Sequence, residues 1–290
     1  MRLLLPLIAL LLIAWAGVET ARGPRRTELA AVLEAFLDAR LRRDEAAAHS
    51  WLTPSARRQF EEAGETIAGA SNPHWTYFAL RSWNGVEALV TAHEGYSATA
   101  YASYREERLT WGKVGGKWRI VRARFTPRHT LRASRDGSAI LYAAVGATGT
   151  PGPRAVLRLA DLPAEFTPAG ASPEIRFGVG RARFGPLAFS PVNPSQFAFS
   201  SGGVHGFVGL ATLQGFQRGL DLYFEGDVVE IRWSADGRYL MVDVLGPSSQ
   251  VITTIYDVAS GARLPIERIR AYPSPIPSQR LIVSLQPRPF

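Results

Sequence analysis

His93 and Glu94 are the adjacent side chains best suited to acid–base chemistry, since an imidazole and a carboxylate can exchange a proton. Further carboxylates, Glu87, Glu106 and Glu107, lie on or near the expected strands. A catalytic acid or base needs a partner that orients it, and none of these residues stands in a motif that supplies one. Neighbouring residues of a regular strand point to opposite faces, so His93 and Glu94 are not expected to act together. We therefore predict no catalytic residue.

Aromatic side chains follow the same stretch and could line an apolar pocket beside these groups. The pocket candidates are Trp75, Tyr77, His93, Glu94, Tyr101 and Trp111. The alternative is that the aromatic residues form the packed core of a small sheet, and we favour that interpretation.

The sequence excludes several other chemistries. It contains no cysteine, which rules out thiolate catalysis, disulfides, and zinc–thiolate or iron–sulfur sites. The five histidines are never spaced as local metal ligands. Gly178-Val179-Gly180 lacks the third glycine of a dinucleotide loop, and the motifs of nucleotide hydrolases, serine hydrolases and zinc proteases are missing. We expect neither a cofactor nor a metal.

The chain carries a net charge of +8, and all but two of its 33 basic residues are arginine. A nucleic-acid-binding surface should gather such residues into a stripe with stacking aromatics. Along this sequence the arginines are scattered, so we expect no nucleic-acid partner.

The N-terminus has the order of a signal peptide: Arg2, an apolar run over residues 3–18, and the small-residue site Ala14-Trp15-Ala16. Three arginines between residues 22 and 26 put more positive charge after the run than before it, which counts against export under the positive-inside rule. We predict that residues 1–21 are a signal peptide or N-terminal anchor. The protein is expected to be exported to the cell envelope or beyond it, with membrane anchorage as a variant.

Residues 27–127 have the pattern of an α+β domain. Apolar positions over 29–41 follow the spacing of one buried helical stripe. A second helix is expected from Asp44, and Thr53-Pro54 should begin a third, because Thr caps helices and Pro is tolerated in their first turn. Alternating patterns then predict antiparallel strands at 75–83, 86–93, 96–104, 109–114 and 118–125.

Three strings in this region resemble the small exported NTF2-like domains of bacteria: Phe36-Leu37-Asp38-Ala39, Leu52-Thr53-Pro54-Ser55-Ala56-Arg57 and Lys113-Val114-Gly115-Gly116-Lys117-Trp118-Arg119-Ile120. The resemblance implies a curved antiparallel sheet wrapped by helices around a cone-shaped pocket. This scaffold serves enzymes, ligand binders and structural spacers alike.

Residues 128–290 have an all-β pattern with an internal repeat. Ser134-Arg135-Asp136-Gly137 recurs as Ser234-Ala235-Asp236-Gly237, with a degenerate copy over 187–199, at intervals typical of propeller blades. The segment from Ile231 to Leu240 resembles blades of TolB-like and WD40-like propellers. The resemblance implies propeller-like blades, and three recognisable units predict an open or minimal arrangement with a free β edge. A β-sandwich with repeated hairpins is the alternative.

These features predict an exported, non-catalytic binding or scaffolding protein of the bacterial cell envelope. Its β blades would be the interaction platform, with a protein partner or self-association at the open β edge. Two alternatives remain open: an envelope hydrolase or isomerase with its site in the cone, and a membrane-anchored ligand sensor.

Overall fold

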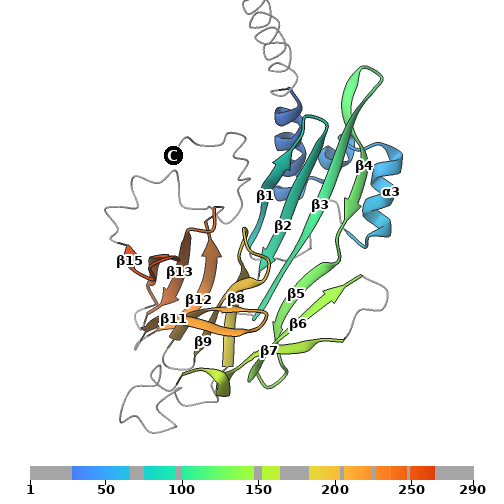
Figure 1. The fold of residues 1–290 in the computed structure, drawn as a ribbon. Coiled ribbons are helices and arrows are strands. Elements are labelled where there is room, and N and C mark those ends of the chain that lie inside the picture. The colour runs from blue at the N-terminus through green and yellow to red at the C-terminus, as the bar shows by residue number, and fades with distance from the viewer. Residues whose placement is uncertain are drawn as a thin grey trace, which may run out of the picture.

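The computed structural model describes residues 28–65, 75–95, 100–146, 152–163, 183–202, 206–223, 226–234, 236–246 and 249–264. The predicted signal peptide or anchor, 1–21, lies outside the described residues. Figure 1 shows helices beside the upper part of one long sheet, with two smaller sheets at the lower end. Within the described ranges, no helix combines the length and the apolar character needed to cross a bilayer.

The second and third helices begin where the sequence predicts. Residues 28–41 form the first helix, followed by α2 (Glu45–Ser50) and α3 (Pro54–Glu62). Asp44 caps α2 by accepting a hydrogen bond from the Ala47 amide at 2.9 Å, and Thr53 caps α3 in the same way from Ala56 at 3.2 Å. Both predicted caps are therefore confirmed.

The first sheet has seven antiparallel strands, with β4 pairing beside β3. Its strands are β1 (Trp75–Trp83), β2 (Glu87–Gly95), β3 (Tyr101–Val114), β4 (Lys117–Phe125), β5 (Arg128–Ala133), β6 (Ala139–Val145) and β7 (Arg154–Arg158). A short 3-10 helix, η1 (Leu159–Asp161), follows β7. The chain before α3 covers the outer edge of β4, because the Ile120 amide donates to Trp51 O at 2.8 Å and Thr53 N donates to Ile120 O at 3.0 Å.

Two four-stranded antiparallel sheets follow. The second sheet contains β8 (Arg183–Phe189), β9 (Gln196–Gly202), β10 (Gly206–Thr212) and β11 (Gly215–Tyr223). The third contains β12 (Asp227–Trp233), β13 (Tyr239–Leu245), β14 (Val251–Asp257) and β15 (Arg263–Leu264). Each is a simple meander in which neighbours in sequence are neighbours in the sheet.

The predicted fold class is wrong. We expected an α+β NTF2-like domain over 27–127 and an all-β domain of propeller-like blades over 128–290. The chain is instead mostly β, in antiparallel sheets that do not close, and the first sheet continues across residues 127 and 128. The cause is β3, which was predicted as two strands separated by a charged break. It is one strand of 14 residues whose first half pairs with β5 and whose second half pairs with β4.

The repeated hairpin turns are confirmed. In the first, Ser134 Oγ donates to Asp136 Oδ1 at 2.6 Å and accepts from Ala139 N at 3.0 Å. The same two bonds recur at 2.6 and 2.9 Å in the turn that starts at Ser234. These turns join β5 to β6 and β12 to β13, so the repeat marks equivalent hairpins in different sheets.

Gly237 lies where the turn of the third sheet packs on the corresponding turn of the second. Its φ is +69°, and a Cβ built there would lie 2.4 Å from Cγ2 of Val192. We expect Gly237→Ala to lower the free energy of unfolding by about 1–3 kcal/mol, from backbone strain and from this contact. Gly116→Ala is the control, because its φ is +76° but no atom lies within 4 Å of the new methyl group. Equal losses in urea unfolding of the two variants would contradict this packing.

The three sheets are joined by specific contacts. Tyr104 of β3 packs its ring edge-on against Phe189 of β8 at 4.8 Å between centroids. The indole N–H of Trp233 on β12 donates to Ala188 O at 3.0 Å, and Tyr256 Oη donates to Asp221 Oδ2 at 2.5 Å. The second and third sheets therefore share one core.

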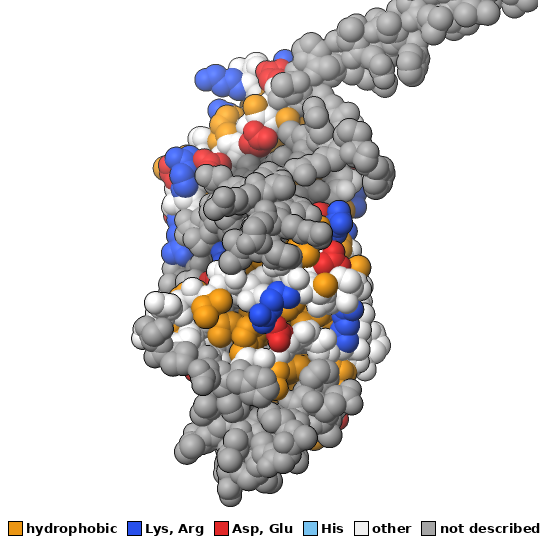
Figure 2. Space-filling view, turned by 90° about the vertical axis from the view of Figure 1, so that its left-hand side faces the viewer, with side chains coloured by type: hydrophobic (Ala, Val, Ile, Leu, Met, Phe, Trp, Pro, Cys, Tyr) orange, Lys and Arg blue, Asp and Glu red, His pale blue; other side chains and the backbone are white. Residues whose placement is uncertain are grey.

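The third sheet lies on the side of the molecule shown in Figure 2, where hydrophobic side chains gather in the middle and basic side chains appear at the upper end. Val251 and Ile252 of β14 are 58% and 56% exposed. Because β15 pairs only with Ile255 and Tyr256, the outer edge of Val251–Thr254 is unpaired among the described residues.

Candidate functional site

The two faces of β3 have different surroundings. Leu109 and Trp111 face the helices and belong to the core that those helices cover. Tyr104 and Arg108, at even positions, face away from the helices. The odd positions Arg105 and Glu107, between the two predicted strands, thus point into the helix-covered interior, where both are buried.

A chain of six alternating charges fills this part of the interior. Arg40 of the first helix holds Glu107 with two hydrogen bonds, at 2.5 and 3.0 Å. Arg105 donates to Glu107 at 3.0 Å and pairs on its other side with Glu65. Arg128 continues the chain, contacting Glu65 at 2.5 Å and Glu94 at 2.7 Å. Three cations thus balance three carboxylates.

Burial and pairing fix the ionisation of this charge chain. Burial alone would raise the pKa of Glu107, but the attraction of Arg40 and Arg105 lowers it to about 2. Burial raises the pKa of Glu65 in spite of its two arginines. Burial lowers the pKa of Arg128, but Glu94 and Glu65 more than offset this and leave it raised. Since Glu107 stays ionised and doubly bonded, it is poorly suited to give or take a proton near neutral pH.

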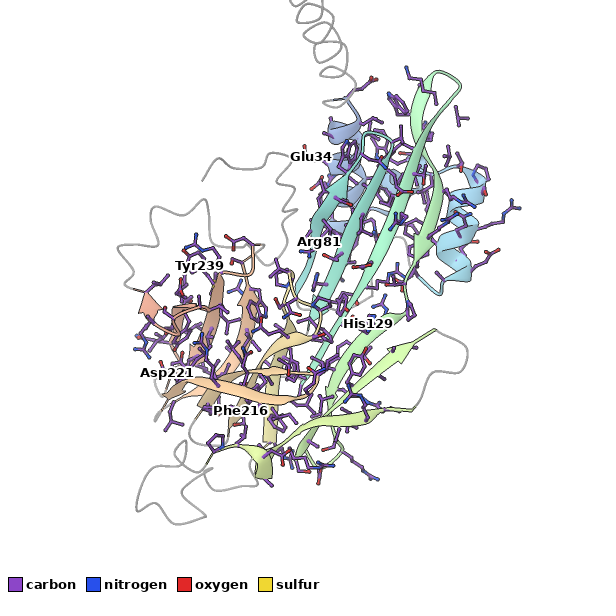
Figure 3. The ribbon with its side chains drawn as sticks, in the orientation of Figure 1. Glu34, Arg81, His129, Phe216, Asp221 and Tyr239 are labelled. Carbon is purple, nitrogen blue, oxygen red and sulfur yellow. The ribbon has the colours of Figure 1, made fainter. Side chains whose placement is uncertain are left out.

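A row of rings crosses the opposite face of the sheet from β2 to β6. His93 stacks on Tyr104 at 5.6 Å between centroids, and Tyr104 stacks on His129 at 4.7 Å. His129 Nδ1 lies 2.7 Å from the hydroxyl of Tyr142. Figure 3 labels His129 on β5 and, at the opposite side of the row, Arg81 on β1, whose guanidinium donates to Pro191 O at 2.8 Å.

His93 is only 1% exposed, and burial, assisted by Arg81, lowers its pKa to about 3. The imidazole therefore stays neutral at physiological pH, and the row is well suited to packing the first sheet against the second. Burial also lowers the pKa of His129 and raises that of Tyr142. Neither shift activates the pair, because a base is more effective with a pKa near the working pH and a tyrosine nucleophile needs a lowered one.

The four predicted pocket residues whose side chains are described do not line one pocket. His93 and Glu94 point to opposite faces: His93 joins the ring row, whereas Glu94 accepts hydrogen bonds from Arg128 and Ser103. Trp111 is 4% exposed and packs in the helix-covered core, and Tyr101 is half-buried at the start of β3. Trp75 and Tyr77 lie on β1, but their side chains are outside the described residues.

The residues that sequence reasoning missed form an exposed basic face on β3 and β4, opposite the helices. Arg108 and Arg124 are direct cross-strand neighbours, and Arg122 and Arg119 follow along β4 opposite Thr110 and Gly112. We call Arg108, Arg122 and Arg124 the basic face; Arg119 is half-buried, and its guanidinium lies 5.9 Å from the centre of the Trp51 ring, next to α2. The signal for this face in the sequence was the alternation of arginines with other residues along β4. A register shift after Thr110 interrupts that alternation by one residue.

Two carboxylates share this side of the sheet with the arginines of the basic face. Glu87 pairs with Arg108 at 2.8 Å, and Glu106 lies further along β3. Arg122 and Arg124 are exposed, and Arg108 keeps 49% of its side chain exposed. Like charges placed directly opposite each other destabilise a strand pair, and here Glu87 offsets only part of that repulsion, at Arg108.

Among the residues that the structure describes, no three His, Asp or Glu side chains gather as ligands for a metal ion. No protein-family model matches this chain, and no curated protein matches it in sequence. The two family resemblances drawn from the sequence thus gain no support from these comparisons, and the inference of function rests on the geometry.

Proposed function

We propose that this chain is an exported, non-catalytic binding protein whose basic face docks an acidic region of a protein partner. The observation that carries the proposal is the cross-strand pair of exposed arginines, Arg108 and Arg124. A sheet gains nothing in stability from placing two cations opposite each other. An acidic partner would relieve that repulsion on binding.

The contrast between interior and surface charges supports this assignment. The buried arginines Arg40 and Arg105 each contact a carboxylate within the fold, so they are already neutralised. Among the residues that the structure describes, Arg108 is the one arginine of the basic face with a carboxylate partner in an ion pair, Glu87, and both side chains are partly exposed. Exposed charges of this kind contribute little to folding but raise the rate and selectivity of association.

The chemistry of the basic face favours a protein over a nucleic acid. Beside its arginines the described strands β3 and β4 present Thr110, whose side chain offers no ring on which a base could stack. Carboxylates of an acidic segment need no stacking partner and can take both N–H donors of a guanidinium. A scaffolding or docking role follows more naturally from this surface than the envelope enzyme or ligand sensor also considered.

The open edge of β14 is a second place for a protein contact. The N–H of Asp257 donates to Ala262 O, on the side of β14 that faces away from β13. Main-chain hydrogen bonds alternate in direction from one residue of a strand to the next, so the main-chain groups of Val251 and Thr253, six and four residues before Asp257, also point outward. An extended segment of a partner, or a second copy of this chain, could add there as a further strand.

Variants that replace arginines with uncharged glutamines test the basic face. We expect the triple change of Arg108, Arg122 and Arg124 to Gln to weaken binding of fluorescent poly-glutamate about tenfold at low salt, measured by anisotropy. The matched control changes Arg58, Arg132 and Arg135, all exposed elsewhere, to Gln and so removes the same charge. We expect the control to weaken binding by no more than about twofold. Equal losses in the two triple variants would attribute binding to net charge and would refute the proposal.

A further inference from the structure

Two hairpin tips lie together at the upper end of the molecule. Figure 1 places the turns of β1–β2 and β3–β4 there, at the end where the first described helix begins. The β1–β2 turn lies beside β3, because the Trp111 amide donates to Val86 O at 2.8 Å, and Val114 follows three residues further along β3, at its turn into β4. We call Val86, Lys113, Val114 and Lys117 the tip surface, which shares no residue with the basic face.

The tip surface combines exposed apolar groups with amines. Val86 and Val114, at the turns of the two hairpins, are 53% and 52% exposed. Lys113 and Lys117 are exposed on either side of Val114 and are the two lysines of the whole sequence. The ammonium of Lys113 lies 5.1 Å from the ring of Trp118, which is half-buried beneath it.

This combination matches the chemistry of a bilayer surface. Small apolar groups enter the region between headgroups and acyl chains, tryptophan rings favour that depth, and lysines are attracted to anionic headgroups. A protein partner would present a shaped surface, whereas the two valines project from separate turns. The contact we infer is therefore with lipid.

The length of chain before the first described helix supports the same orientation. The apolar run at residues 3–18 is separated from residue 28 by the nine residues 19–27. Such a segment spans at most about 30 Å when fully extended. If the apolar run is held by a membrane, the end of the molecule that carries the tip surface is within reach of that membrane.

We propose that the tip surface contacts an anionic lipid bilayer, with Val86 and Val114 entering the headgroup region and Lys113 and Lys117 pairing with lipid phosphates. This contact orients the protein so that the sheet with its basic face stands away from the membrane.

Site-specific labelling of the full-length chain tests this contact. The sequence has no cysteine, so Val114→Cys can carry a single environment-sensitive fluorophore. The matched control is Val145→Cys at the end of β6, because Val145 is 55% exposed and β6 lies in the lower half of Figure 1. Each labelled protein is mixed with vesicles of phosphatidylcholine alone or with added phosphatidylglycerol, both containing spin-labelled quencher lipids.

We expect quenching at position 114 with anionic vesicles, little quenching at 145, and loss of the signal at 114 when Lys113 and Lys117 are changed to Glu. Three results would overturn the proposal: no quenching at position 114, equal quenching at both positions, or equal quenching at 114 with the two vesicle compositions. Persistence of the signal in the Lys113→Glu, Lys117→Glu variant would also exclude a contact that depends on the two lysines.

Discussion

Replacing Glu107 with glutamine should lower the free energy of unfolding by about 3–5 kcal/mol, because two buried guanidiniums lose their shared anion. Glu107 is fully buried and bonds to both Arg40 and Arg105. Glutamine has almost the same shape, so the change removes charge without opening a cavity. Urea unfolding at neutral pH measures the loss.

Glu87→Gln is the control for the same chemistry at the surface. Glu87 also pairs with an arginine on β3, but its side chain is 28% exposed and that of Arg108 is 49% exposed. We expect a loss below about 1 kcal/mol, since water screens exposed ion pairs. If both variants lost the same stability, the buried charge chain would not be stabilised as described.

The effect of Glu107→Gln should also depend on pH in a defined direction. The pKa of Glu107 falls from an ordinary 4.5 to about 2 in the fold. A lowered pKa contributes stability that is complete above pH 4.5 and is lost as the pH falls towards 2. The two values correspond to about 3 kcal/mol at neutral pH. The difference between wild type and variant should therefore shrink as unfolding is measured at lower pH.

Trp233→Ala should cost about 3–5 kcal/mol, because it empties the core shared by the second and third sheets. Trp233 is completely buried among side chains of both sheets, including Val208 and Val242. It also donates a hydrogen bond to Ala188 O. Hydrogen exchange should show faster opening of β8 to β14, while β2 and β3 keep their protection.

Trp233→Phe separates the two contributions of this residue. Phenylalanine refills most of the volume but cannot donate to Ala188 O, so we expect a loss of about 1–3 kcal/mol. If Trp233→Ala cost less than this, the two sheets would not depend on a common core.

Local features of the fold could be predicted because their causes are local. Asp44 and Thr53 cap helices through amides three residues away, and Ser134 and Ser234 close their turns on nearby Asp side chains. Short-range hydrogen bonds of this kind depend on few neighbours. They do not reveal which sheet a hairpin joins, which is why the repeat was assigned to blades and the fold class was wrong.

The centre of β3 shows why the remainder could not be predicted. Arg105-Glu106-Glu107-Arg108 has the composition of a solvated turn, and it was treated as a break between strands. The partner that permits its burial, Arg40, is 67 residues from Glu107. No pattern along the chain indicates that pairing. The basic face was missed for a related reason, since its members come from two strands across a shifted register.

The long strand β3 also connects the basic face to the core of the protein. One face of β3 bears the buried charge chain and the helix-covered core, and the other carries the ring row and then the basic face. Arg108 is therefore held on a strand that is fixed on both sides. A rigid sheet of this kind presents its charges with little loss of entropy on binding.

Differential capture from a cell-envelope extract tests the proposed function most directly. Three baits are compared: the full-length chain, the triple Gln variant of Arg108, Arg122 and Arg124, and the charge-matched triple Gln variant of Arg58, Arg132 and Arg135. If the basic face docks an acidic protein, the first and third baits should recover the same acidic partner, and the second should lose it. Recovery of the same proteins in the same amounts by all three baits would contradict the proposed function.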